Sequence, residues 1–140
     1  MPACTFFGHR DCPDSVLPQL EAEVERLIAE HSVDTFYVGN QGNFDRLAAG
    51  VLRRMKEKYP HVRYYIVLPY IPQHSAPENS LLPDGIESVH PRYAIVWRNR
   101  WMISRSDFVI TFIAHSFGGA AAAAKIASNK GKTVINLADE

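Results

Sequence analysis

Three short segments combine glycine with polar side chains that can bind an anion or a hydroxyl group. They are GHR at 8–10, GNQGNFD at 39–45 and HSFGG at 115–119, and each follows an apolar run. Glycine permits a positive φ and a close backbone approach, and the N–H groups at the start of a helix attract anions. The second and third segments also precede helical patterns. This composition favours a site for a phosphate-bearing ligand.

The side chains of these segments suit different parts of such a ligand. Arg10 can pair with a phosphate through two parallel hydrogen bonds, and Ser116 can donate another. The carboxylate of Asp45 only accepts hydrogen bonds, which suits a ribose hydroxyl. His9, Asn40 and His115 can provide further polar contacts. The predicted ligand-binding residues are Gly8, His9, Arg10, Gly39, Asn40, Gly42, Asp45, His115, Ser116, Gly118 and Gly119.

A purely structural interpretation of the same residues stays open. The segment 39–45 can form an N-capped turn in which Asp45 interacts with the positive end of a helix dipole. The alanine run at 120–124 can reflect helix propensity alone. Two glycines directly before a strong helix are costly, however, unless the backbone must approach something closely. That cost favours a functional role for Gly118 and Gly119.

Several common chemistries lack their sequence motif. The chain has no GxGxxG of dinucleotide-binding proteins, no GxxxxGK[ST] of P-loop NTPases and no GxSxG of serine hydrolases. His9, His74, His90 and His115 do not fall at metal-ligand spacings. We therefore predict no metal and no cofactor, and the residues alone identify no catalytic group.

The elements that must position these segments alternate between strand and helix patterns. Strands are expected at 3–8, 35–39, 63–70, 106–114 and 133–137. Helices are expected from an N-cap at Ser15 to residue 31, from residue 44 to before Pro60, over 92–105, and after Gly119, with a long loop at 71–91. This alternation predicts an α/β fold: a three-layer, Rossmann-like domain with a mainly parallel sheet of about five strands and helices on both faces. Such sheets bind ligands at the carboxyl ends of their strands.

Composition limits the classes of partner. The 140 residues fit one domain spanning 1–140, and 15 basic residues balance 15 acidic ones. Because its net charge is zero, the chain is not expected to bind nucleic acid through its overall charge. No apolar run is long enough to cross a membrane, and the start has no signal-peptide pattern, so a cytoplasmic location is expected. Cys4 is expected in the core, and Cys12 as a free thiol in a loop.

The helix expected at 92–105 carries arginines together with two tryptophans. Tryptophan and arginine can form a surface that stacks bases and binds phosphates. The same pattern also fits a buried tryptophan face with solvated arginines, or a contact in a homodimer or higher homo-oligomer. The residues concerned are Arg92, Trp97, Arg98, Arg100, Trp101 and Arg105.

The motifs TFFGHR, VGNQGNFDRLA and HSFGGAA, in this order, resemble those of the SLOG superfamily, the Rossmann-like group of DprA/Smf proteins and LOG-type phosphoribohydrolases. The similarity extends over essentially the whole chain and is greatest to the small YpsA-like branch. LOG enzymes carry PGGxGTxxE, whose glycines hold phosphate and whose glutamate assists N-glycosidic cleavage. Gly118 and Gly119 match those glycines, whereas Lys125 stands at the glutamate.

The resemblance implies a domain that binds a nucleotide or a phosphorylated nucleoside derivative. A lysine cannot replace a carboxylate that stabilises an oxocarbenium ion, so hydrolysis would need Asp45 or Glu87 as a substitute. Two alternatives therefore stay open. One is a nucleoside 5′-monophosphate phosphoribohydrolase, and the other is a protein-interaction module that uses the tryptophan–arginine helix.

Overall fold

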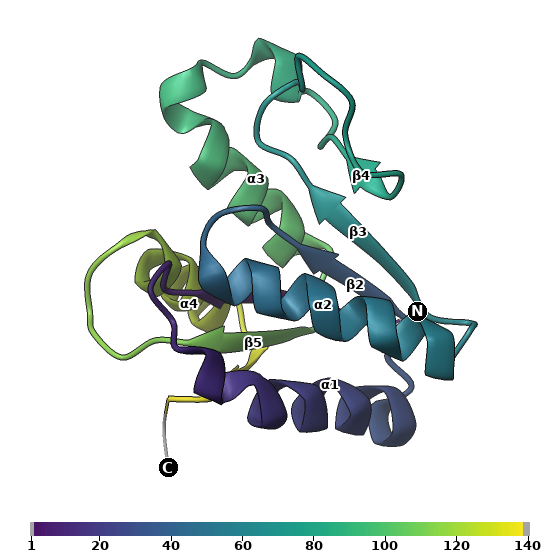
Figure 1. Cartoon of the computed structure of the whole chain (residues 1–140). Coiled ribbons are helices and arrows are strands. Elements are labelled where there is room, and N and C mark those ends of the chain that lie inside the picture. Colours follow the sequence, from purple (N-terminus) through teal and green to yellow (C-terminus); the bar gives the residue numbers. More distant parts are fainter. Residues whose placement is uncertain (1, 139–140) are drawn as a thin grey trace.

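The computed structural model describes residues 2–138 and contains a parallel β-sheet between two layers of helices (Figure 1). The described chain forms six strands in the order β4-β3-β2-β1-β5-β6, and every neighbouring pair is parallel. The α/β, Rossmann-like prediction is confirmed, with six strands instead of about five. The strands are β1 Ala3–Gly8, β2 Thr35–Val38, β3 Arg63–Val67, β4 Ser80–Leu81, β5 Phe108–Phe112 and β6 Thr133–Asn136.

The four α-helices pack in pairs on the two faces of the sheet. They are α1 Leu17–His31, α2 Asn43–Lys58, α3 Ala94–Ser104 and α4 Gly119–Asn129. Helices α1 and α2 cover one face, and α3 and α4 cover the other (Figure 1). In the described residues, no helix combines the length and the apolar character that crossing a membrane requires.

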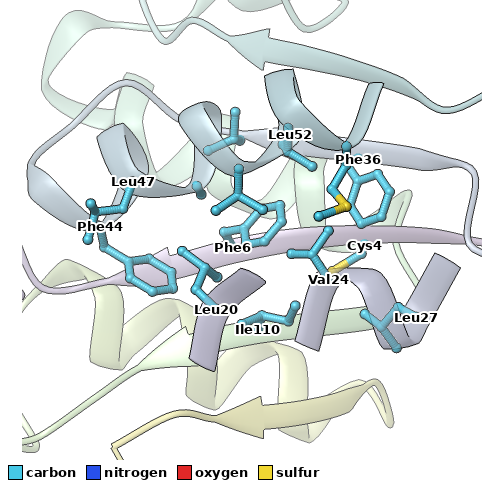
Figure 2. Packing of buried hydrophobic residues seen from close by; sticks show 14 of the residues in the cluster. Cys4, Phe6, Leu20, Val24, Leu27, Phe36, Phe44, Leu47, Leu52 and Ile110 are labelled. Carbon is cyan, nitrogen blue, oxygen red and sulfur yellow. The ribbon is translucent and has the colours of Figure 1, made fainter. Parts of the chain in front are cut away.

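Strand β1 contributes to both hydrophobic cores because successive side chains point to opposite faces of a sheet. Figure 2 shows Cys4 and Phe6 packed among side chains of α1 and α2. The ring of Phe6 stacks on Phe36 of β2 with 6.1 Å between the centroids. Phe7 instead joins the core beneath α3 and α4. Because each fully buried side chain of this kind contributes about 1.5–3 kcal/mol, the two cores fix the end of β1 in space.

Several predicted boundaries were wrong. Ser15 does not cap α1, because Asp14–Val16 forms a 3₁₀ turn and Val16 occupies the N-cap position. The long loop expected at 71–91 contains β4 and the 3₁₀ turn Ile86–Ser88. The helix expected from residue 92 begins at Ala94, after the 3₁₀ turn Pro91–Tyr93.

The predicted strands were too long at their ends. The strand expected at 63–70 ends at Val67, that at 106–114 covers Phe108–Phe112, and that at 133–137 ends at Asn136. Apolar residues continue past the carboxyl ends of these strands, at Leu68, Ile113 and Leu137, and favour longer strands. The residue-to-residue pairing nevertheless ends at Val67, Phe112 and Asn136.

Both cysteines are buried and unbridged. Cys4 lies in the core as expected, and burial raises the pKa of its thiol. Cys12 does lie in a loop, but its side chain is buried, and burial raises its pKa to about 11. A thiol with so high a pKa is a poor nucleophile at neutral pH. Cys12 therefore packs as a small apolar residue.

Candidate functional site

A pocket of about 430 Å³ opens at the carboxyl end of β1. From β1 the chain builds outward through β2, β3 and β4, and it then returns to place β5 on the other side of β1. Open parallel sheets bind ligands at this point, where the strand order reverses. The pocket is lined by Phe6, Phe7, Gly8, His9, Arg10, Asp11, Gln41, Asp45, Ile95, Arg98, Asn99, Met102, His115, Phe117, Gly118, Gly119 and Ala120.

Gly8 and Gly42 bring the first two predicted segments together. A Cβ on Gly8 would lie 2.2 Å from Cγ of Phe44, so only glycine lets β1 end against the first turn of α2. Gly42 has a φ of 92°, and a Cβ there would lie 2.6 Å from Cα of Arg10. The N–H of Asn43 donates to the carbonyl oxygen of Arg10 at 2.9 Å. These contacts fix Arg10 beside the start of α2.

Of the two predicted reasons for glycine, a positive φ and a close approach, only the close approach applies to Gly39. Its φ is not positive, unlike that of Gly42. A Cβ at Gly39 would instead lie 2.8 Å from Oδ2 of Asp45 and 3.0 Å from Nη1 of Arg98. The missing side chain therefore makes room for two charged groups.

Asp45 lies in the first turn of α2 and is buried at the pocket. Its Oδ2 accepts a hydrogen bond from the backbone N–H of Gln41 at 2.9 Å. Burial raises the pKa of Asp45 to about 6, although the Gln41 hydrogen bond and the charge of Arg98 oppose this rise. A carboxyl group with such a pKa can gain or lose a proton near neutral pH.

Arg98 was missed as a site residue, and the prediction that the arginines of its helix are solvated was wrong for it. Its side chain is buried, and Nη1 donates to the carbonyl oxygen of Val67 at 2.8 Å and to Oδ1 of Asn40 at 3.2 Å. Burial lowers the pKa of Arg98, whereas Asp45 raises it. The spacing gave a signal, because Arg98 lies four residues from both Ala94 and Met102 on the buried face of α3.

His9 is held at the pocket by the turn that follows β5. Its Nε2 accepts a hydrogen bond from the backbone N–H of Ala114 at 3.0 Å. Since that nitrogen must be unprotonated, neutral His9 carries its proton on Nδ1. Burial and the nearby His115 lower the pKa of His9, which favours this neutral form.

The third predicted segment forms the opposite wall of the pocket. Gly118 has a φ of 97° and is the N-cap of α4, and no side chain of the described residues caps this helix start. A Cβ on Gly118 or Gly119 would meet no heavy atom within 4 Å. The backbone at the start of α4 therefore borders open space within the pocket.

Not all predicted residues reach this pocket. Ser116 is exposed and does not line it. Gly39, Gly42 and Asn40 line a smaller neighbouring cavity of about 240 Å³, to which Asp45 also contributes. Asn43 of the segment 39–45 also lies outside the pocket lining, and its Nδ2 donates to the carbonyl oxygen of Cys12 at 2.6 Å.

The candidate substitutes for the missing glutamate differ in position. Asp45 lines the pocket, whereas Glu87 is exposed in the turn Ile86–Ser88 and does not. Lys125 is exposed on α4 and is also absent from the pocket lining. Within residues 2–138, no three His, Cys, Asp or Glu side chains gather closely enough to hold a metal ion.

The two tryptophans of α3 have different surroundings. Trp101 is half-buried, and its ring meets Tyr37 edge-on with 5.4 Å between the centroids. Arg105 lies over the ring of Trp101, 4.1 Å from its centroid. Trp97 is 42% exposed. Only Trp97 is therefore available as an exposed contact.

A solved structure with a similar fold supports the Rossmann-like architecture of this chain. No family model matches the sequence, and no curated protein does so either. The X-ray structure of DNA processing protein A (DprA) from Streptococcus pneumoniae is similar with a TM-score of 0.71 and 16% sequence identity. The chain has the Rossmann-like fold of DprA. This likeness covers 96% of the chain and 49% of DprA, so the chain spans about half the length of that protein. At this identity the likeness to DprA concerns the fold, and the YpsA-like branch stays a prediction.

Proposed function

We propose that this chain is a SLOG-like domain that binds a nucleotide or a phosphorylated nucleoside derivative in the pocket at the carboxyl end of β1. The observation that carries the proposal is the pocket itself, which has about 430 Å³ at the reversal of strand order. Pockets for small ligands commonly measure about 300–1,000 Å³ and combine apolar walls with a few polar groups. Phe7 and Met102 are apolar members of this lining, and Arg98 and Asp45 are polar ones.

The start of α4 is the proposed phosphate position. The first N–H groups of a helix have no partner within the helix, and the helix dipole favours an anion there. Gly118 and Gly119 leave space in front of these groups. Arg10 lines the same pocket. Its Nη2 donates a hydrogen bond to Oε1 of Gln41 at 2.8 Å, and Gln41 also lines the pocket. A phosphate at this position would meet backbone donors and a guanidinium group.

Asp45 and Arg98 are the proposed partners of the sugar. The carboxylate of Asp45 accepts one hydrogen bond from Gln41 and has lone pairs left for a ribose hydroxyl. Arg98 is oriented by Val67 and Asn40 through Nη1 and by Oδ1 of Asn99 through Nε. Its Nη2 makes no hydrogen bond to another described residue and is a donor for the ligand. A charged donor held in this way discriminates against ligands that lack an acceptor.

Titration calorimetry with AMP, ADP and ADP-ribose tests the proposal. At least one of them is expected to bind the native chain, and Gly119→Val is expected to abolish that binding because the added side chain fills the phosphate position. Ala122→Val is the matched control, since Ala122 is exposed on the same helix and does not line the pocket. Equal binding by Gly119→Val and the native chain would refute this phosphate position.

Phosphoribohydrolase activity is a second candidate function, favoured by one observation. Asp45 is a carboxyl group in the pocket with a pKa raised to about 6, the range suited to general acid–base catalysis. Release of free base and ribose 5-phosphate from a nucleoside monophosphate would establish it. This activity must then disappear in Asp45→Asn, although the remaining amide oxygen can still accept a hydrogen bond from the ribose hydroxyl and retain part of the binding. If the chain binds a nucleoside monophosphate and no ribose 5-phosphate accumulates, hydrolysis of that ligand is refuted and binding alone is left.

A further inference from the structure

Three aromatic rings from two segments form a continuous stack at the mouth of the pocket. His9 stacks on His115 with 3.6 Å between the centroids and 12° between the planes. His115 in turn stacks on Phe117, with 3.8 Å and 17°. All three residues line the pocket, and Phe117 is 70% exposed. Phe117 is therefore the outer end of the stack.

The stack is fixed at its inner end and along its length. His9 is buried, accepts a hydrogen bond from Ala114 and meets the ring of Phe112 edge-on. Nδ1 of His115 lies 3.1 Å from the carbonyl oxygen of Phe117. Oδ1 of Asn136 accepts a hydrogen bond from the N–H of Ile113 at 2.9 Å, which holds the preceding turn against β6. The ring of Phe117 thus packs on this anchored stack and places a large apolar side chain where solvent reaches it.

We infer that the exposed ring of Phe117 is the stacking platform for the nucleobase of the ligand. This inference rests on the proposed function, because the ring directly precedes Gly118 and Gly119, the proposed phosphate position. A ligand bound there would extend its base toward the pocket mouth, next to Phe117. Every nucleobase has a π-face that stacks on an aromatic ring, so this platform selects for the presence of a base and only weakly for its identity.

The test compares a ligand that has a base with one that lacks it. AMP, UMP and ribose 5-phosphate share the phosphate and the ribose, and they are titrated into the native chain, Phe117→Ala and Phe117→Trp. Phe117→Ala is expected to weaken AMP binding roughly tenfold or more and UMP binding somewhat less. Binding of ribose 5-phosphate is expected to stay the same, and Phe117→Trp is expected to retain AMP binding.

The control is Tyr93→Ala, because Tyr93 is an exposed aromatic residue that does not line the pocket. It is expected to bind all three ligands like the native chain. Unchanged AMP affinity in Phe117→Ala would overturn the platform while leaving the phosphate pocket in place. Loss of ribose 5-phosphate binding in the same variant would also overturn it, because Phe117 would then act on the sugar phosphate. Tighter native binding of a short oligothymidylate than of any mononucleotide would assign the platform to a nucleic-acid strand and contradict the mononucleotide assignment.

Discussion

The carboxylate of Asp45 and the guanidinium of Arg98 both border the space that a Cβ on Gly39 would occupy. That Cβ would be 2.8 Å from Oδ2 of Asp45 and 3.0 Å from Nη1 of Arg98. Both side chains are buried, and opposite charges in a poorly solvated site favour each other's ionised form. The turn after β2 therefore needs a glycine to keep two charged groups at one pocket.

Replacement of Gly39 by alanine tests this arrangement. The added methyl group must displace Asp45 or Arg98, so Gly39→Ala is expected to lower the free energy of unfolding by about 1–3 kcal/mol. Gly50→Ala is the matched control, because a Cβ at Gly50 in α2 would meet only Nη1 of Arg54 at 3.8 Å. That helical substitution is expected to stabilise the chain by about 0.5–1 kcal/mol. Equal effects in urea denaturation would contradict the crowding at Gly39.

The raised pKa of Asp45 predicts a pH-dependent stability. The folded chain raises this pKa from 3.8 to about 6, so the fold favours the protonated form. The resulting stabilisation is fully present below about pH 4 and is lost as the pH rises through about 6. Asp45→Asn lacks this titration. Relative to that variant, the native chain should lose roughly 2 kcal/mol of unfolding free energy between pH 4 and pH 7. A difference that stays constant with pH would exclude a raised pKa.

Arg98 is expected to act on the ligand and on Asp45. Arg98→Met retains an unbranched side chain but removes the charge, so affinity for a nucleoside monophosphate should fall at least tenfold. The pKa of Asp45 should rise further, because Arg98 lowers it in the native chain. Arg100→Met changes an exposed residue of the same helix and serves as the control. Calorimetry and NMR titration of the Asp45 carboxyl carbon measure the two effects, and equal affinities in the two variants would remove Arg98 from the site.

The hypothesis of an interaction surface on α3 needs Trp97 as its probe. Trp101→Ala removes a ring that packs on Tyr37 and should lower the free energy of unfolding by about 2–4 kcal/mol. With that variant, loss of an oligomer could not be distinguished from unfolding of the chain. Trp97→Ala should leave the fold intact. If α3 forms a homo-oligomer contact, Trp97→Ala shifts the sedimentation coefficient toward that of the monomer. An oligomer of unchanged size in that variant would argue against this surface.

The sequence allowed the sheet and its carboxyl edge to be predicted, because their signals are local. A short continuous run of mostly apolar residues defines β1, which is buried on both faces, and the spacing of Phe44, Leu47 and Val51 defines the buried face of α2. Strand β4 has only two residues, too few to show a period of two. A single short strand of this kind is recognised only when its partner, β3, is known.

The parts of the site that escaped prediction depend on tertiary contacts. Arginine is usually solvated, so the burial of Arg98 became evident only once α3 was placed against β3 and the turn after β2. The stack of His9, His115 and Phe117 joins segments more than a hundred residues apart. Ser116 was included because a hydroxyl beside glycines suits a phosphate, but the turn leaves it outside the pocket lining.

Ligand-observed proton NMR of the native chain with nucleoside monophosphates, nucleoside diphosphates and ADP-ribose tests the central claim most directly. The account predicts selective broadening of at least one of these ligands, and predicts that Gly119→Val removes the broadening whereas Ala122→Val retains it. Growth of ribose 5-phosphate signals with time would add hydrolysis to binding. If no ligand broadens with the native chain, the pocket at the carboxyl end of β1 does not bind a nucleotide, and the proposed function is wrong.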